Sequence, residues 1–180
     1  MFQSPYRRGA DDGFIFGLYL TAMFLASIFS GAAPLLSLVS LALMAGVPGV
    51  IYMFMKRYDR RTGMTASFPM FWMQGVMIFF CGMLIAGTVL VVYMKWLSPD
   101  FVLRQLQSVA AMKGSIPGSV MDDAASVASS MIENNFIPTP IAIVTELIML
   151  AIVTGSILSI ILGAILTLRR RATRPLSPQK

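Results

Sequence analysis

The chain has 180 residues, of which 57% are hydrophobic and 12% are charged, and its mean hydropathy is +0.76. An ordinary soluble domain has about 25% charged residues, so this composition excludes that class and predicts a polytopic membrane protein. The formal charge is +6, but the chain has no His, one Cys and eight acidic residues. Metal, triad and thiol chemistry all need residues that this chain nearly lacks. We therefore expect no enzymatic activity, no metal site and no cofactor.

Four apolar stretches are long enough to cross a bilayer, which takes about 20 residues in a helix. We expect an all-α fold forming a single domain over residues 1–180, with transmembrane helices at about 14–32, 34–55, 68–94 and 141–168. Only a few small residues separate the first two stretches. Such a short connection predicts that the first two spans form an antiparallel hairpin.

The distribution of basic residues predicts the orientation of these spans. Lys and Arg accumulate in the cytoplasmic loops of membrane proteins. Here they lie in the N-terminal segment, in the loop after the second span and in the C-terminal tail: Arg7, Arg8, Lys56, Arg57, Arg60, Arg61, Arg169, Arg170, Arg171, Arg174 and Lys180. We therefore expect a multi-pass protein of the bacterial inner membrane with both termini in the cytoplasm.

The same basic residues indicate the kind of partner to expect. Cations at span ends attract the anionic headgroups of membrane lipids at the cytoplasmic face, whereas no folded basic domain is present to bind nucleic acid. The run Arg169 to Arg171 is typical of a stop-transfer signal, and a grip on a specific lipid or on an acidic patch of a partner is the alternative.

The connection between the third and fourth spans, residues 96–137, predicts two amphipathic helices outside the membrane. We expect Ser98 to cap the first helix, Ser119 to begin a capping box for the second, and Asn134 and Asn135 to end it. This extracytoplasmic hairpin either folds over its own bundle or presents a docking face to a periplasmic partner.

Glu146 is the only charged residue within the four apolar stretches. At about 1.5 Å per residue, it lies about 35 Å along the last helix from Arg169, near the outer membrane boundary. There we expect it to pair with Lys95 or Arg104 or to reach water. A structural role at the interface is the simpler interpretation, and a transport or proton-relay role is the alternative.

Small residues on the last span recur every four positions, at Ala151, Gly155, Ser159 and Gly163. A ridge of small side chains lets two helices approach closely, so these residues predict a helix-packing surface, either within the bundle or between copies of the chain. A weaker ridge at Ala22, Ala26 and Ser30 lies on the first span.

Several segments together resemble a known family. They are GFIFGLYL from Gly13 to Leu20, the tight turn to Pro34, FPMFWMQG from Phe68 to Gly75, and the helical segment that leads into a long last span. This arrangement, from about Asp11 to Leu168, is similar to the family of small bacterial inner-membrane proteins known as domain of unknown function 4199. The resemblance implies a four-span membrane protein and assigns no functional residues.

Two classes of function fit these observations. The first is a non-enzymatic accessory or scaffold subunit of a membrane assembly, which contacts a membrane protein partner or a second copy of itself. The alternative is a small carrier or lipid-handling protein that binds a lipid or a lipid-linked precursor between its helices. A carrier needs a polar site near the membrane midplane, which the apolar stretches do not offer.

Overall fold

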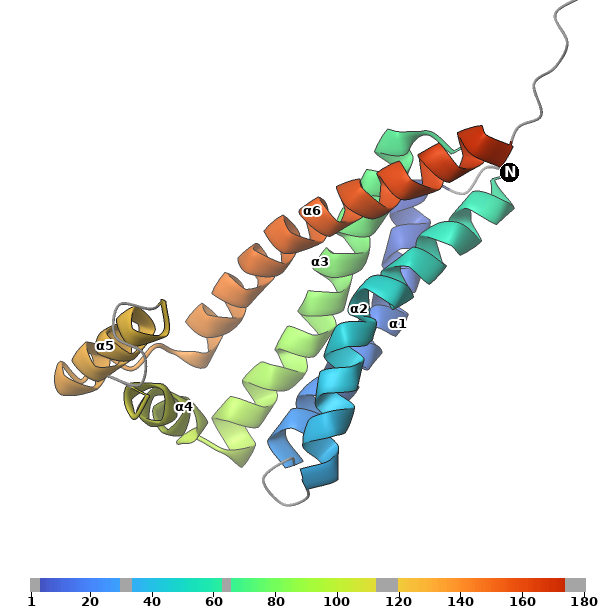
Figure 1. Cartoon of the computed structure of the whole chain (residues 1–180). Coiled ribbons are helices and arrows are strands. Elements are labelled where there is room, and N and C mark those ends of the chain that lie inside the picture. The colour runs from blue at the N-terminus through green and yellow to red at the C-terminus, as the bar shows by residue number, and fades with distance from the viewer. Residues whose placement is uncertain (1–3, 30–33, 63–65, 113–119, 174–180) are drawn as a thin grey trace, which may run out of the picture. The chain divides into compact units, whose positions relative to one another are not determined.

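A computed structural model describes residues 4–29, 34–62, 66–112 and 120–173 of the chain (Figure 1). Within these residues every regular element is a helix, as the all-α prediction requires. The helices are α1 (Pro5–Phe29), α2 (Pro34–Arg61), α3 (Phe68–Val92), a π-helical turn (Tyr93–Leu97), α4 (Phe101–Ala110), α5 (Val120–Glu133) and α6 (Pro140–Thr173). Four of them, α1, α2, α3 continued by the π-helical turn, and α6, are long and apolar enough to cross a membrane.

The first and second helices extend beyond the predicted spans into charged sequence. α1 begins at Pro5 instead of near residue 14, and α2 continues to Arg61 instead of ending near residue 55. In α1 the charged turn is bridged by an ion pair between Arg8 and Asp12, four residues apart, with 3.4 Å between Nη2 and Oδ1. Hydropathy marks where apolar residues end, whereas a helix can continue into polar sequence, as α1 and α2 both do.

The chain divides into two compact units. One contains residues 1–86 and 147–180, and the other contains residues 87–146. The first unit therefore holds α1, α2, most of α3 and most of α6, and it contains the apolar core. That core is built from Phe16, Ile51, Phe54, Met55, Tyr58, Ala66, Phe71, Ile78, Phe79, Leu162 and Leu166.

Glycines bring α1 and α3 into direct backbone contact. A Cβ atom at Gly9, Gly13 or Gly17 would lie 2.6 to 2.8 Å from a Cβ atom of α3, so only glycine fits at these positions. The spacing of four residues puts all three on one face of α1. The weaker ridge predicted on the first span does not coincide with these glycines. Of its residues, Ala22 is exposed, Ala26 is half-buried and Ser30 lies outside the described residues.

The small residues of α6 face α3. The Ser159 side chain is fully buried and lies where a Cβ atom of Gly75 would be. Gly155 lies against the ring of Phe79. Farther along α6, a Cβ atom at Gly163 would be 3.3 Å from the Cβ atom of Phe71, and Ala151 is half-buried. Three of the four residues singled out on this helix therefore lie against α3.

In the second unit, α4 and α5 pack side by side (Figure 1). Val102 of α4 and Ala125 and Ala128 of α5 are buried. α5 ends at Glu133, and Asn135 adopts a left-handed conformation with φ of 52°, as expected for a helix terminus at these asparagines.

The predicted start of α4 is wrong. The helix begins at Phe101 with Asp100 as its N-cap, and Ser98 does not cap it. The Ser98 hydroxyl instead accepts a hydrogen bond from the Arg104 guanidinium. The π-helical turn carries the chain to Leu97, so Ser98 lies too early to cap a helix that starts three residues later. The predicted cap at Ser119 lies outside the described residues.

The glycine contacts of α1 make a matched test possible. Gly13→Ala places a Cβ atom 2.7 Å from Cys81 and 3.2 Å from the Ile78 carbonyl oxygen, so α1 and α3 must separate. We expect a loss of about 1–3 kcal/mol in the free energy of unfolding, measured by thermal unfolding in detergent. Gly49→Ala in α2 is the control, because nothing lies within 4 Å of its Cβ position. That variant should gain about 0.5–1 kcal/mol, and equal shifts in both variants would contradict this packing.

Candidate functional site

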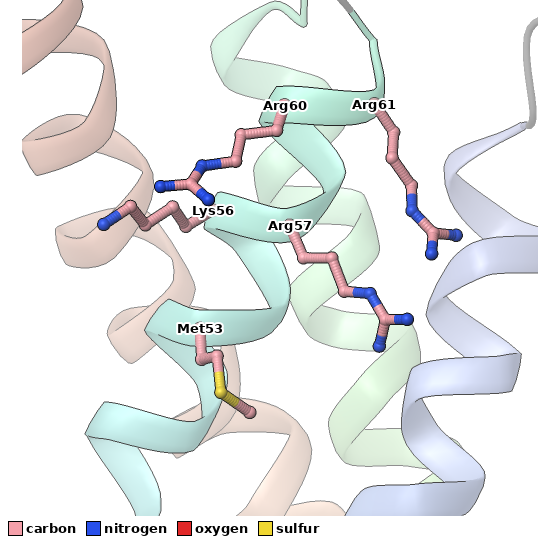
Figure 2. Close-up of a pocket in the computed structure, with 5 residues that line it drawn as sticks. All are labelled: Met53, Lys56, Arg57, Arg60 and Arg61. Carbon is pink, nitrogen blue, oxygen red and sulfur yellow. The ribbon is translucent and has the colours of Figure 1, made fainter.

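The last turns of α2 carry four cations around a hollow of about 490 Å³ (Figure 2). Its lining residues are Met53, Lys56, Arg57, Arg60 and Arg61. At 3.6 residues per turn, the four cations fall within an arc of about 140° on one side of the helix. Met53 lies one turn deeper and exposes 57% of its surface. The hollow therefore has a basic rim and an apolar floor.

The cations extend in two directions from α2. Arg57 and Arg61 extend toward α1, whereas Lys56 and Arg60 extend toward α6 (Figure 2). None of the four forms a hydrogen bond through its side chain or a salt bridge with another described residue. Four like charges on adjacent turns repel one another, and a bound anion would relieve that repulsion.

On the α6 side, two cations approach one tyrosine. The Lys56 ammonium lies 5.9 Å from the centre of the Tyr52 ring. Arg169 of α6 donates a hydrogen bond of 3.1 Å to the Tyr52 hydroxyl. The contact joins α2 to α6 at this end of the bundle and adds another positive charge beside the hollow.

On the α1 side, a buried carboxylate lies close to the hollow. Asp12 is 1% exposed, and its Oδ2 accepts a hydrogen bond of 3.1 Å from the Gln74 amide of α3. Its Oδ1 forms the ion pair with Arg8. Arg57 and Arg61 of α2 also interact electrostatically with this carboxylate. Asp12 thus links α1 to α3 at the basic end of the bundle, where the cations of α2 also act on it.

This buried polar cluster is incompletely hydrogen-bonded. Asp12 Oδ1, Gln74 Oε1 and Arg8 Nε are all buried and lack a hydrogen-bond partner in the described structure. Buried polar atoms of this kind are costly unless they are hydrogen-bonded. The sequence contained a signal for it, since Gln74 is the one amide side chain within the third apolar stretch and Asp12 precedes the first. Asp12 was not among the site residues predicted from the sequence.

Glu146, the candidate polar residue, lies in the second unit. It is exposed, and it forms no ion pair with Lys95, with Arg104 or with any other residue that the structure describes. Arg104 is bonded to Ser98 instead. No contact in the described structure therefore supports the predicted pairing of Glu146 with Lys95 or Arg104.

The chemistry available at the hollow is electrostatic. Lys and Arg donate hydrogen bonds and attract anions, and phosphate and carboxylate groups are their preferred partners. Among the described residues, no group of three or more His, Cys, Asp or Glu side chains could hold a metal ion. The arrangement is suited to binding an anion at the end of the helix bundle.

The four apolar helices define a helical membrane protein of four spans. The model of the family described as "Protein of unknown function (DUF4199)" matches residues 11–167, so the chain belongs to the DUF4199 family. This is the family that the sequence segments resembled. No curated protein and no solved structure matches the chain.

Asp12 and its neighbour Asp11 form a matched pair for mutation. Asp12→Asn removes the charge that pairs with the partly buried Arg8, and we expect a loss of about 1–3 kcal/mol in the free energy of unfolding. Asp11 is exposed on the same turn, and Asp11→Asn should change it by less than about 0.5 kcal/mol. Thermal unfolding in detergent measures both. Equal effects would show that the buried carboxylate contributes nothing particular to stability.

Proposed function

We propose that this protein is a non-enzymatic, lipid-handling protein of the bacterial inner membrane that binds the phosphate headgroup of an anionic lipid at the basic hollow of α2. The observation that carries the proposal is that Lys56, Arg57, Arg60 and Arg61 all line one hollow. Their side chains form no salt bridge with a described residue, so the hollow keeps positive charge to offer a ligand.

The position of the hollow favours a lipid over a soluble anion. The hollow lies at the end of an apolar helix, where lipid headgroups meet water. Met53 lies one turn closer to the apolar part of α2 and is largely exposed. A phospholipid matches this arrangement, because its phosphate would contact the cations while its acyl chains run along the apolar helix surface.

The proposal includes the orientation of the chain. The ends of α1, α2 and α6 that carry Arg8, Arg61 and Arg169 lie at the same end of the first unit (Figure 1). The positive-inside rule supports a cytoplasmic position for this end, and hence for both termini. The cytoplasmic leaflet is also rich in anionic lipids, whose attraction is worth about 1 kcal/mol per cation.

A second candidate function is an accessory or scaffold subunit, which the helices of the second unit favour. α5 exposes 87% of Val120, 56% of Met121 and 51% of Val127, although it is not among the helices that could span a membrane. These side chains form an apolar surface that suits a membrane protein partner or a second copy of the chain.

The lipid proposal predicts selective retention of lipid. Native mass spectrometry of the purified protein with equal phosphatidylglycerol and phosphatidylcholine should show preferential binding of phosphatidylglycerol. Replacing Lys56, Arg57, Arg60 and Arg61 by Gln should reduce that preference at least about tenfold. Raising the salt from about 0.1 to about 1 M should also weaken it, since the screening length falls from about 10 to about 3 Å.

Arg7→Gln is the control, because Arg7 is exposed on α1 and does not line the hollow. Equal retention of phosphatidylglycerol by the wild type and by the variant with all four Gln substitutions would contradict the lipid proposal. Mass spectrometry of the protein extracted in nanodiscs tests the second candidate: a protein partner at stoichiometric level would favour the accessory subunit.

The orientation has its own test. Alkaline phosphatase is active only outside the cytoplasm. A fusion after Met112, in the segment between α4 and α5, should be active, and a fusion after Lys180 should be inactive, because basic residues keep the termini inside. Enzyme activity measured in whole cells, with expression compared by immunoblot, gives the answer. The reverse pattern of activity would place both termini outside.

A further inference from the structure

We infer that Asp12 is a built-in counter-ion of the basic hollow, which holds Arg57 and Arg61 and leaves Lys56 and Arg60 to bind the phosphate group. This inference rests on the proposed lipid binding and specifies which cations carry it. Asp12 is then a positioning residue, because it acts on the ligand only through the two arginines.

The directions of the four side chains support this division. Arg57 and Arg61 extend toward α1, the helix that carries Asp12, and Lys56 and Arg60 extend toward α6 (Figure 2). One anion therefore lies on the α1 side of the hollow. On the α6 side the structure instead places a further cation, Arg169, against Tyr52.

The buried carboxylate has bonding capacity left for the arginines. Asp12 Oδ1 is completely shielded from solvent and accepts no hydrogen bond in the described structure, and its contact with Arg8 is a long 3.4 Å. A carboxylate accepts up to about four hydrogen bonds, so Arg8 and Gln74 do not saturate it. Arg57 and Arg61, which act electrostatically on this carboxylate, are the further cations near it on α2.

The α6 side offers what a phosphate group needs. Lys56 and Arg60 lie one turn apart on α2 and both line the hollow. An ammonium and a guanidinium together present several N–H donors to a tetrahedral oxyanion. The ring of Tyr52 lies 5.9 Å from the Lys56 ammonium and helps to position that cation.

Two double variants remove the same charge from the same two turns of α2 and so control for each other. They are Lys56→Gln with Arg60→Gln, and Arg57→Gln with Arg61→Gln. We measure the binding of phosphatidylglycerol relative to phosphatidylcholine by native mass spectrometry. The first pair should reduce the preference by about 10- to 30-fold, and the second by less than about threefold.

Asp12→Asn supplies a readout that a purely structural role would not change. Released from Asp12, Arg57 and Arg61 should increase phosphatidylglycerol binding about fivefold. In this background, Arg57→Gln with Arg61→Gln should cost at least about tenfold, although the same pair costs little in the wild type. Such non-additivity is the signature of a direct interaction between the groups. Asp12→Glu, which retains the charge, should restore the wild-type pattern.

The possible outcomes separate this inference from the proposed function. Equal losses from the two double variants in the wild type would overturn the counter-ion role and leave lipid binding intact. If neither double variant nor the variant with all four Gln substitutions lost its preference for phosphatidylglycerol, both the counter-ion role and the proposed lipid binding would be overturned. Displacement of phosphatidylglycerol by millimolar inorganic phosphate would assign the Lys56 and Arg60 site to a free ion instead of a lipid. The double variants leave Asp12, Gln74 and Arg8 in place, so they test the inference even if Asp12→Asn fails to fold.

Discussion

The close approach of α1 to α3 is the constraint on which the rest of the first unit depends. Lipid chains are as apolar as Leu side chains, so membrane helices gain little from hydrophobic burial and associate through tight packing and polar contacts. Glycines at 9, 13 and 17 remove the side chains that would hold α1 away from α3. This contact also determines the position of Asp12, which lies within the glycine ridge and can reach Gln74 only because the backbones meet.

The same contact connects packing to the basic hollow. Asp12 faces α3 through its bond with Gln74 and acts electrostatically on Arg57 and Arg61 of α2. α6 completes the arrangement from the other side, where small residues bring it against α3 and Arg169 reaches Tyr52 of α2. Close packing of small residues thus places charged groups from three helices at one end of the bundle. Charge of one sign gathered at one site is what an anionic headgroup requires.

Much of the architecture was predictable from the sequence, because each span is long and apolar by itself. The four membrane-crossing helices, the two shorter helices before the last one and the end of α5 at the asparagines all depend on local signals. A prediction from local sequence was wrong where a side chain bonds to a residue other than the expected one. Ser98 is of a residue type that often caps helices, but its hydroxyl accepts a hydrogen bond from Arg104 instead. On α1, the glycines nearer the N-terminus make the contact with α3, and the ridge predicted at Ala22 and Ala26 stays a prediction.

The sequence by itself determined the membrane class, the four spans and the gathering of basic residues at span ends. These features follow from composition and from the order of apolar and basic residues along the chain. Only the tertiary structure decided that Asp12 bonds with Gln74 and that small residues of α1 and α6 lie against α3. Residues on three helices become neighbours through interhelical packing, which no pattern within a single helix encodes. A lone Asp before an apolar stretch and a lone Gln inside another have no visible relation until the glycines bring α1 and α3 together.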